Sequence, residues 1–236
     1  MKKSVSIIIP AYNDEQTIAS SVRGVSRIAA KLFSDYELLI FEDGSSDRTG
    51  EIVDRLAKRN SRIRVFHNRR NMNVGYSYAL GIRHASKEYV MLLPGPDSLT
   101  PDSLENYMGK IGQADVVISY SGNKKVRLLH RRVISAVVSA FLNLLFGLRL
   151  KYYFGMQMYE KSLVGKVSIT TSSFGVYPEI LIRLVKAGHS VKEVPIMALQ
   201  ETSSTTALRL RNVFGIVSTV FRLFFRVRLK SIRFLF

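Results

Sequence analysis

The first half of the chain alternates between short apolar runs and segments with amphipathic, helical spacing. Four apolar runs predict strands: SVSIIIP (4–10), YELLIFED (36–43), IRVFHN (63–68) and EYVMLL (88–93). The intervening segments predict helices: one from Asn13 or Asp14 to about 33, one within 44–60 and one over 75–86. This alternation is typical of an α/β fold with a mostly parallel sheet and helices on both faces.

Polar and rigid residues gather where these predicted strands end. They are Pro10, Ala11 and Tyr12 in the first strand, Glu42 and Asp43 in the second, and Pro94 to Asp97 after the fourth. Ligands of parallel sheets bind beyond the carboxyl ends of the strands. The pattern therefore predicts one site at that edge.

The second half contains a long apolar helix, predicted over about 131–148. It includes 16 consecutive uncharged residues, Val133 to Leu148. A spanning helix needs roughly 20 apolar residues, and three polar residues interrupt this one. The pattern favours an amphipathic helix at an interface, and the predicted organisation is a half over 1–125, a half over 126–206 and a basic amphipathic helix over 207–236, all in one structural domain.

Charge divides the chain in the same place. Residues 1–115 hold 16 Lys/Arg and 14 Asp/Glu, whereas 116–236 hold 19 and 4, which gives most of the net charge of +17. Because the basic residues interleave with apolar runs, the pattern favours an anionic membrane surface over nucleic acid. The alternative is a tail helix packed on the domain with a solvated basic face.

The amino terminus bears on location. The apolar run from Val5 to Ile9 is too short for the core of a signal peptide, and the chain has no cysteine. We expect no signal peptide and a peripheral or monotopic position on the cytoplasmic face of a membrane.

Three motifs in order resemble those of family 2 glycosyltransferases with the GT-A fold: SVSIIIPAYNDEQTI, FEDGSSDRTGEIV and NMNVGYSYALGIRHASKEYVMLLPGPD. The resemblance covers roughly residues 4–110 and extends more loosely to about 215. The second half resembles dolichyl- or polyprenyl-phosphate sugar synthases. That likeness rests on Arg131 followed by Ser135, on FGMQMYEKS (154–162) and on YPEILIRLVKAGHSVKEVPI (177–196).

The resemblance implies roles in binding a nucleotide sugar. Pro10, Ala11, Tyr12 and Asp14 would line the nucleobase pocket, and Glu42 and Asp43 would contact the base and ribose. The alternatives are an ordinary loop aromatic for Tyr12 and a turn before a helix for the two acids.

The resemblance also implies a divalent metal, Mg²⁺ or Mn²⁺. The family's Asp-x-Asp triplet falls here on Pro94-Gly95-Pro96, and a single acid, Asp97, follows. Mg²⁺ is often held by one or two protein carboxylates together with substrate phosphates, so Asp97 is the candidate metal ligand. The alternative is a β-turn residue.

The implied acceptor is a lipid phosphate. Its phosphate oxygen is anionic near neutral pH, so no strong general base is required. Arg127, Arg131, Arg132 and Ser135 would orient phosphates, with Asp97, Arg131 and Ser135 as the catalytic set and Glu179 in a supporting role, orienting an arginine. The alternative for the arginines is snorkelling at a membrane-surface helix. The family's Ser-Lys pair in the tail is replaced by Thr205-Thr206, which removes a phosphate contact.

Two functional hypotheses follow from these features. The first is an inverting glycosyltransferase that moves a sugar from a nucleotide-sugar donor to a polyprenyl phosphate. The second is a weak or inactive relative that binds nucleotide sugar or membrane as an accessory protein. A membrane-protein partner or a homo-oligomer remains open.

Overall fold

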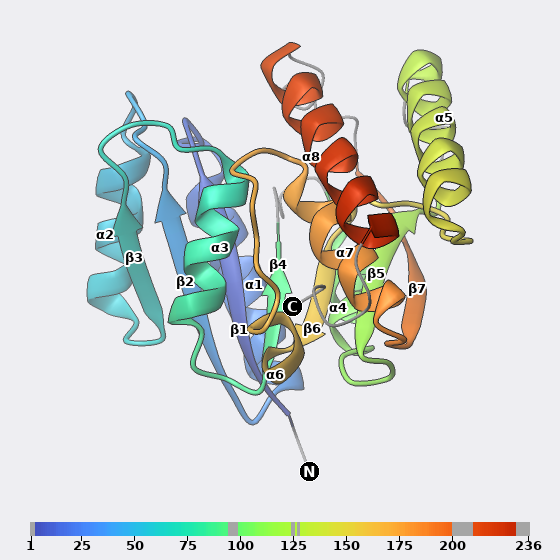
Figure 1. The fold of residues 1–236 in the computed structure, drawn as a ribbon. Coiled ribbons are helices and arrows are strands. Elements are labelled where there is room, and N and C mark those ends of the chain that lie inside the picture. Colours follow the sequence, from blue (N-terminus) through green and yellow to red (C-terminus); the bar gives the residue numbers. More distant parts are fainter. Residues whose placement is uncertain (1–2, 94–98, 124–125, 127, 200–209, 230–236) are drawn as a thin grey trace.

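A mixed sheet forms the centre of the molecule (Figure 1). The computed structural model describes residues 3–93, 99–123, 126, 128–199 and 210–229. Within these residues, seven strands pair in the order β3-β2-β1-β4-β6-β5-β7. They are β1 (Ser4–Ala11), β2 (Asp35–Glu42), β3 (Ile63–His67), β4 (Tyr89–Leu92), β5 (Val116–Ser121), β6 (Gln157–Glu160) and β7 (Val191–Ile196). Only β6 runs antiparallel to its neighbours β4 and β5, so the predicted mostly parallel α/β sheet is confirmed.

Helices cover both faces of the sheet. They are α1 (Ile18–Leu32), α2 (Thr49–Arg59), α3 (Val74–His84), α4 (Pro101–Met108), α5 (Leu129–Phe146), α6 (Lys161–Val164), α7 (Val176–Lys186) and α8 (Leu210–Leu229). Apolar residues of α1, α2 and α4 pack in one core cluster, and those of α3, α5, α6, α7 and α8 pack in the other.

The strands lie between these two clusters, and the side chains of each strand point alternately into one and the other. Ile7 and Ile9 of β1 point into the first cluster and Ile8 into the second, because successive side chains of a strand face opposite sides. All three side chains are fully buried. A buried isoleucine stabilises the fold by about 1.5–3 kcal/mol relative to an exposed one, so this strand anchors both cores.

The first helix begins later than the sequence predicts. It starts at Ile18 rather than at Asn13 or Asp14. Asn13 has a φ of +54°, which a right-handed helix does not accommodate. The backbone N–H of Asp14 donates to Thr49 Oγ1 at 2.8 Å. Residues 13–15 therefore join the β2–α2 loop instead of forming a first helical turn.

Two helical glycines offer a matched test of this packing. A Cβ at Gly81 of α3 would lie 2.7 Å from side-chain atoms of Ile8, whereas a Cβ at Gly24 of α1 would meet nothing within 4 Å. We expect Gly81→Ala to destabilise the protein by about 1–3 kcal/mol through overpacking. Gly24→Ala should stabilise it by about 0.5–1 kcal/mol because alanine favours the helix. Urea denaturation of both variants measures this, and equal shifts would contradict the close contact.

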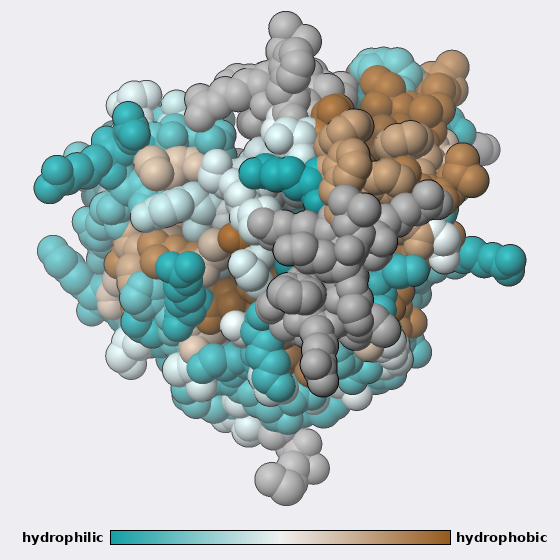
Figure 2. Space-filling model, viewed as in Figure 1, coloured by the Kyte–Doolittle hydropathy of each residue, from teal (hydrophilic) through white to brown (hydrophobic). Residues whose placement is uncertain are grey.

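An apolar surface lies on α5, which with α8 rises beyond the strand ends (Figure 1). Figure 2 shows the brown surface over α5 at the upper right. Its exposed apolar residues are Leu128, Leu129, Val133, Ile134, Val137, Phe141 and Leu144, and α8 adds Val217, Phe221 and Phe225. In the described chain, α5 alone is long and apolar enough to cross a membrane, judged by length and composition, and only 17% of it is buried.

Candidate functional site

The carboxyl ends of β1, β2 and β4 lie side by side. Ala11 at the end of β1 is in register with Glu42 at the end of β2, and Ile8 of β1 is in register with Leu92 of β4. The predicted convergence of strand ends is therefore present for the first two strands. Asp97 lies outside the described residues, so its place at this edge stays a prediction.

Asp43 organises the loop that follows β3. Its carboxylate is 4% exposed and accepts three hydrogen bonds. Asn68 Nδ2 and the backbone N–H of Met72 donate to Oδ1 at 2.8 and 2.7 Å, and the N–H of Asn73 donates to Oδ2 at 2.9 Å. Asn73 holds a φ of +70°, a conformation that asparagine tolerates better than most residues. Asp43 thus fixes the start of α3 against the carboxyl end of β2.

The loops after β1 and β2 are tied to each other. Asn13 donates its N–H to Ser45 Oγ at 3.0 Å, and its side-chain oxygen accepts the N–H of Ser46 at 2.9 Å. The N–H of Tyr12 donates to Asp14 Oδ2 at 3.1 Å. These hydrogen bonds hold the loop that carries the residues predicted to line the nucleobase pocket.

The residues predicted to line the nucleobase pocket differ in their exposure to solvent. Ala11 is buried, Pro10 is half-buried, and the Tyr12 side chain is 45% exposed. An exposed aromatic ring on a tethered loop is suited to stacking on a flat base. Asp14 is half-buried and faces the backbone, which makes it a loop-shaping residue in this geometry.

Glu42 is held by His67, a residue that no sequence motif singles out. Glu42 Oε1 accepts the N–H of Ser45 at 2.5 Å, and Oε2 lies 3.3 Å from His67 Nδ1. The other ring nitrogen, Nε2, lies 2.9 Å from Asp54 Oδ1. Both partners are carboxylates, so the charged imidazolium, which donates from both nitrogens, fits best. Burial lowers the pKa of His67, but hydrogen bonds with Asp54 and Glu42 outweigh it and the pKa lies above its ordinary value.

The raised pKa of His67 predicts a pH dependence. A raised folded-state pKa contributes stability that is fully present below the unfolded value and is lost as pH rises through the folded value. We therefore expect the free-energy difference between the wild type and His67→Gln to shrink as pH rises above about 6.5. The effect should be small because the side chain is 45% exposed. Denaturant melts at several pH values measure it, and a difference that grows with pH would contradict this link.

The arginines and serine of the predicted acceptor set lie on α5. Arg131 and Ser135 are one turn apart and half-buried, and Arg132 is exposed. In Figure 1, α5 stands near β5 and β7, while Glu42 and Asp43 lie across the sheet at the end of β2. The side chains of α5 and the two carboxylates therefore lie at the same edge of the sheet, at separate positions along it and without direct contact. Arg127 lies outside the described residues.

Glu179 pairs with an arginine of its own helix, and its supporting role toward the acceptor arginines stays a prediction. Its carboxylate is fully buried and pairs with Arg183 on the same helix, Oε1 to Nη2, at 3.1 Å. Thr170 donates to it twice, from Oγ1 at 2.6 Å and from its N–H at 3.0 Å. This buried pair fixes the loop before α7 at the site's edge.

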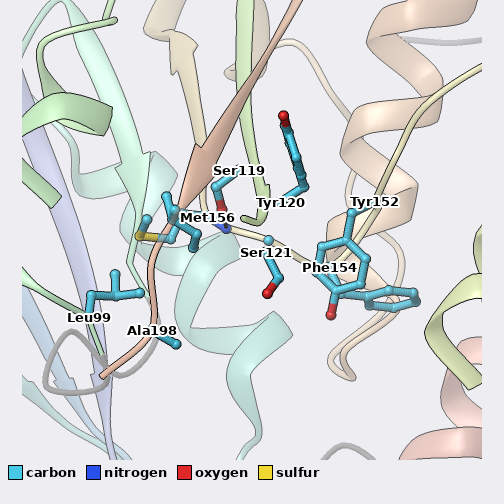
Figure 3. A pocket seen from close by; sticks show the side chains of 10 residues that line it. Leu99, Ser119, Tyr120, Ser121, Tyr152, Phe154, Met156 and Ala198 are labelled. Carbon is cyan, nitrogen blue, oxygen red and sulfur yellow. Dashed lines mark hydrogen bonds between the residues drawn. The ribbon is translucent and has the colours of Figure 1, made fainter. Parts of the chain in front are cut away.

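An aromatic pocket of about 180 Å³ opens at the ends of β5 and β7 (Figure 3). Its lining residues come from the ends of β5 and β7 and from the segments before α4 and β6: Leu99, Ser119, Tyr120, Ser121, Tyr152, Phe154, Gly155, Met156, Ile196 and Ala198. Lys151 Nζ lies 4.4 Å from the Tyr120 ring centroid at its margin.

The family model for glycosyl transferase family 2 matches residues 6–171. This span includes the two tethered loops, Asp43 and eight of the ten residues that line the aromatic pocket. The chain belongs to glycosyl transferase family 2.

Two curated relatives of this family 2 chain are named glycosyltransferases. It is 28% identical over 120 residues to glycosyltransferase GlyG of Streptococcus pneumoniae serotype 4, and 36% identical over 118 residues to the uncharacterized glycosyltransferase EpsJ of Bacillus subtilis. These matches cover 50% and 46% of this chain. The chain spans only 39% and 33% of the lengths of these relatives.

Solved structures support the GT-A-like fold. Glucosyl-3-phosphoglycerate synthase of Mycobacterium tuberculosis in complex with Mg²⁺ and UDP superposes with a TM-score of 0.69 at 17% identity, over 93% of this chain and 79% of that one. The same enzyme with Mn²⁺, UDP and glucosyl-3-phosphoglycerate gives 0.68 at 18% identity, with the same coverage. At these identities the likeness extends to the fold.

The family 2 motifs do not reveal every part of the site. Tyr120, Tyr152 and Phe154 of the aromatic pocket carry no motif that singles them out for binding, and only the antiparallel β6 brings the segment before it to the end of β4. No group of three or more histidine or acidic residues that could hold a metal occurs in the part of the chain that the structure describes. Asp97 lies outside the described residues, so its role as a metal ligand stays a prediction.

Proposed function

We propose that this chain is an inverting glycosyltransferase that moves a sugar from a nucleotide-sugar donor to a polyprenyl phosphate at a membrane surface. The observation that carries this proposal is the exposed apolar face of α5 and α8, which rises from the same sheet edge as the nucleotide-site candidates. An acceptor with a phosphate head and an apolar chain matches a site placed beside such a surface.

The donor half of the proposal rests on the ends of β1 and β2. Tyr12 offers a ring for the base, while Glu42 and the ordered Asp43 offer carboxylates for the base and ribose. The solved relatives hold UDP in complexes with Mg²⁺ or Mn²⁺, which supports a nucleoside diphosphate donor for this chain as well.

A divalent cation fits this site if the phosphate oxygens of the donor supply most of its ligands. Asp97 would supply the protein carboxylate, and phosphate oxygens and water would complete the coordination, as Mg²⁺ often requires. The described residues fit this limited role because they contain no group of three or more histidine or acidic residues that could hold a metal by protein ligands alone. When bound, the ion neutralises the leaving diphosphate.

The reaction is a single displacement at the anomeric carbon. An anionic oxygen of the acceptor phosphate attacks from the face opposite the diphosphate and forms the new C–O bond. The bond from the anomeric carbon to the diphosphate breaks, its electron pair leaves with the nucleoside diphosphate, and the configuration inverts. Arg131 and Ser135 would orient the acceptor phosphate, with Arg127 and Arg132 nearby in sequence, because the arginine fork suits phosphate oxygens.

A transfer assay tests this function directly. The full chain is incubated with a panel of nucleotide sugars and either undecaprenyl phosphate or phosphoglyceric acid, with and without EDTA. We expect transfer to the lipid phosphate that EDTA and Asp97→Ala both abolish. Transfer only to phosphoglyceric acid would overturn the lipid acceptor, and no turnover with any donor would overturn the enzyme proposal.

Membrane association gives a separate prediction. The double variant Phe141→Glu/Leu144→Glu places two charges on the exposed face of α5, where these side chains are 55% and 85% exposed. We expect it to reduce sedimentation with phosphatidylglycerol vesicles by about tenfold or more, because binding scales with buried apolar area. Ser20→Glu/Ala30→Glu on exposed positions of α1 adds the same charge as a control. Equal loss in both variants, or stronger retention on DNA than on vesicles, would contradict the membrane surface.

The second candidate function is an accessory protein that binds nucleotide sugar without transfer. The lone Asp97 in place of Asp-x-Asp favours it. Metal-independent binding of UDP without turnover would support it. Its partner would be a membrane protein or a second copy of the chain, which light scattering with and without membranes can separate.

A further inference from the structure

A second, polar pocket shares no lining residue with the aromatic pocket. It has a volume of about 320 Å³, and three parts of the chain line it: the start of α3, the loop before α7 and one face of α8. The lining residues are Asn73, Thr170, Thr171, Ser172, Ser173, Gly215 and Arg222. The lining contains four consecutive hydroxyl residues and one guanidinium but no acid.

Close packing places α8 over this pocket. A Cβ at Gly215 would lie 2.6 Å from Ser173 Cβ and Oγ, and a Cβ at Gly175 would lie 2.6 Å from Thr219 Oγ1. Gly215, Thr219 and Arg222 are spaced four and three residues apart, so they share one face of the helix. The small residues allow close approach, and the same face carries Arg222 to the pocket.

The opposite wall is fixed to the nucleotide-site candidates. The N–H of Gly75 donates to the carbonyl of Ser172 at 2.9 Å, and a Cβ at Gly75 would lie 2.5 Å from Ser172 C. The N–H of Asn73 donates to Asp43 Oδ2. The pocket is therefore one hydrogen bond away from the carboxylate that organises the end of β2.

Several donors in the pocket are available for a ligand. Within the described residues, the side-chain amide of Asn73 and the hydroxyl of Ser172 make no hydrogen bond, and Arg222 makes one weak bond, from Nε to the Ser218 carbonyl at 3.4 Å. Donors around one guanidinium, with no carboxylate in the lining, favour an anion. A phosphate group offers several acceptor oxygens to such a set.

We propose that this pocket binds a phosphate group and that Arg222 supplies the cation for it. Arg222 is the only charged residue of the lining and comes to the pocket from α8. The proposal deepens the proposed function and rests on it for the source of the phosphate, which is either the donor diphosphate or the acceptor phosphate. Both sources share the same chemistry, and the experiment separates them.

The test is direct binding without lipid, so that membrane association does not contribute. UDP, farnesyl phosphate, inorganic phosphate and uridine are titrated into the wild type, Arg222→Gln and Ser172→Asp. The control is Arg23→Gln, which removes the same charge from an exposed position of α1. Ser172 is exposed, so the aspartate adds charge without disturbing the core. Thermal melts verify that each variant is folded.

We expect both pocket variants to weaken inorganic phosphate by roughly tenfold or more, the loss expected for a charge-assisted hydrogen bond, and to leave uridine unchanged. A matching loss for UDP assigns the pocket to the donor, and one for farnesyl phosphate assigns it to the acceptor. Phosphate affinities within about twofold of Arg23→Gln overturn the proposal. If the pocket variants bind phosphate more weakly but the wild type transfers no sugar, the phosphate pocket is supported and the transferase proposal is overturned. If the wild type transfers sugar but the pocket variants bind phosphate as tightly as it does, the transferase proposal is supported and the phosphate pocket is overturned.

Discussion

Asp43→Ala is expected to reduce donor affinity by at least about a hundredfold and to lower the free energy of unfolding by about 2–4 kcal/mol. The carboxylate is buried and accepts bonds from Asn68 and from the backbone N–H groups of Met72 and Asn73. Alanine leaves these donors unpaired, and each buried unsatisfied group costs about 1–3 kcal/mol. The start of α3 then loses its anchor, and with it the geometry of the donor site.

Isothermal titration with UDP and urea denaturation measure the two effects. Asp43→Asn is the matched variant, because it keeps the shape but turns an amide NH₂ toward groups that need an acceptor, so it should fall between the wild type and Asp43→Ala. Asp35→Ala is the control at the opposite end of β2, where the carboxylate is 46% exposed and pairs with Arg62 and Lys87. Donor affinity that drops equally in both alanine variants would contradict a local role for Asp43.

Glu179→Ala is expected to destabilise the protein by about 3–5 kcal/mol. Arg183 is only 3% exposed in its side chain and pairs with Glu179 inside the second core cluster. Removing one partner of a buried ion pair leaves an uncompensated charge, which is far more costly than removing both. The double variant Glu179→Met/Arg183→Met should therefore recover most of the loss.

Denaturant melts of Glu179→Ala and of the double variant Glu179→Met/Arg183→Met measure this coupling. Glu51→Gln serves as the surface control, since its pair with Arg48 joins side chains that are 68% and 67% exposed and such pairs contribute at most about 1 kcal/mol. A double variant less stable than Glu179→Ala would show that the loss of stability comes from removing the ion pair itself and not from leaving Arg183 as an unpaired buried charge.

Much of the donor half could be read from the sequence. The apolar runs around Ile8 and Leu39 match buried parallel strands because a sheet covered on both faces requires continuous apolar residues. Parallel strands also place their carboxyl ends at one edge, so the neighbourhood of Tyr12 and Glu42 followed from order alone. Periodicity does not specify where a loop uses its polar side chains, which is why α1 begins four residues after Asp14.

Contacts between distant segments could not be read in this way. His67 lies 25 residues from Glu42, and nothing in its local sequence indicates the two carboxylates at its ring nitrogens. The aromatic pocket depends on β6 pairing antiparallel to β4 and β5. The roles of Asp97 and Arg127 remain predictions for mutagenesis.

The sequence by itself determined the α/β class, the family, the edge where the ends of β1 and β2 meet and the basic, apolar character of the second half. These properties depend on local periodicity, on the order of motifs and on composition, all of which are fixed along the chain. Only the tertiary structure decided that Asp43 anchors the start of α3, that Glu179 pairs inside the core and that Arg222 comes to lie beside Asn73. Such contacts arise when elements far apart in sequence pack together, and their free energies depend on burial and geometry that no local pattern encodes.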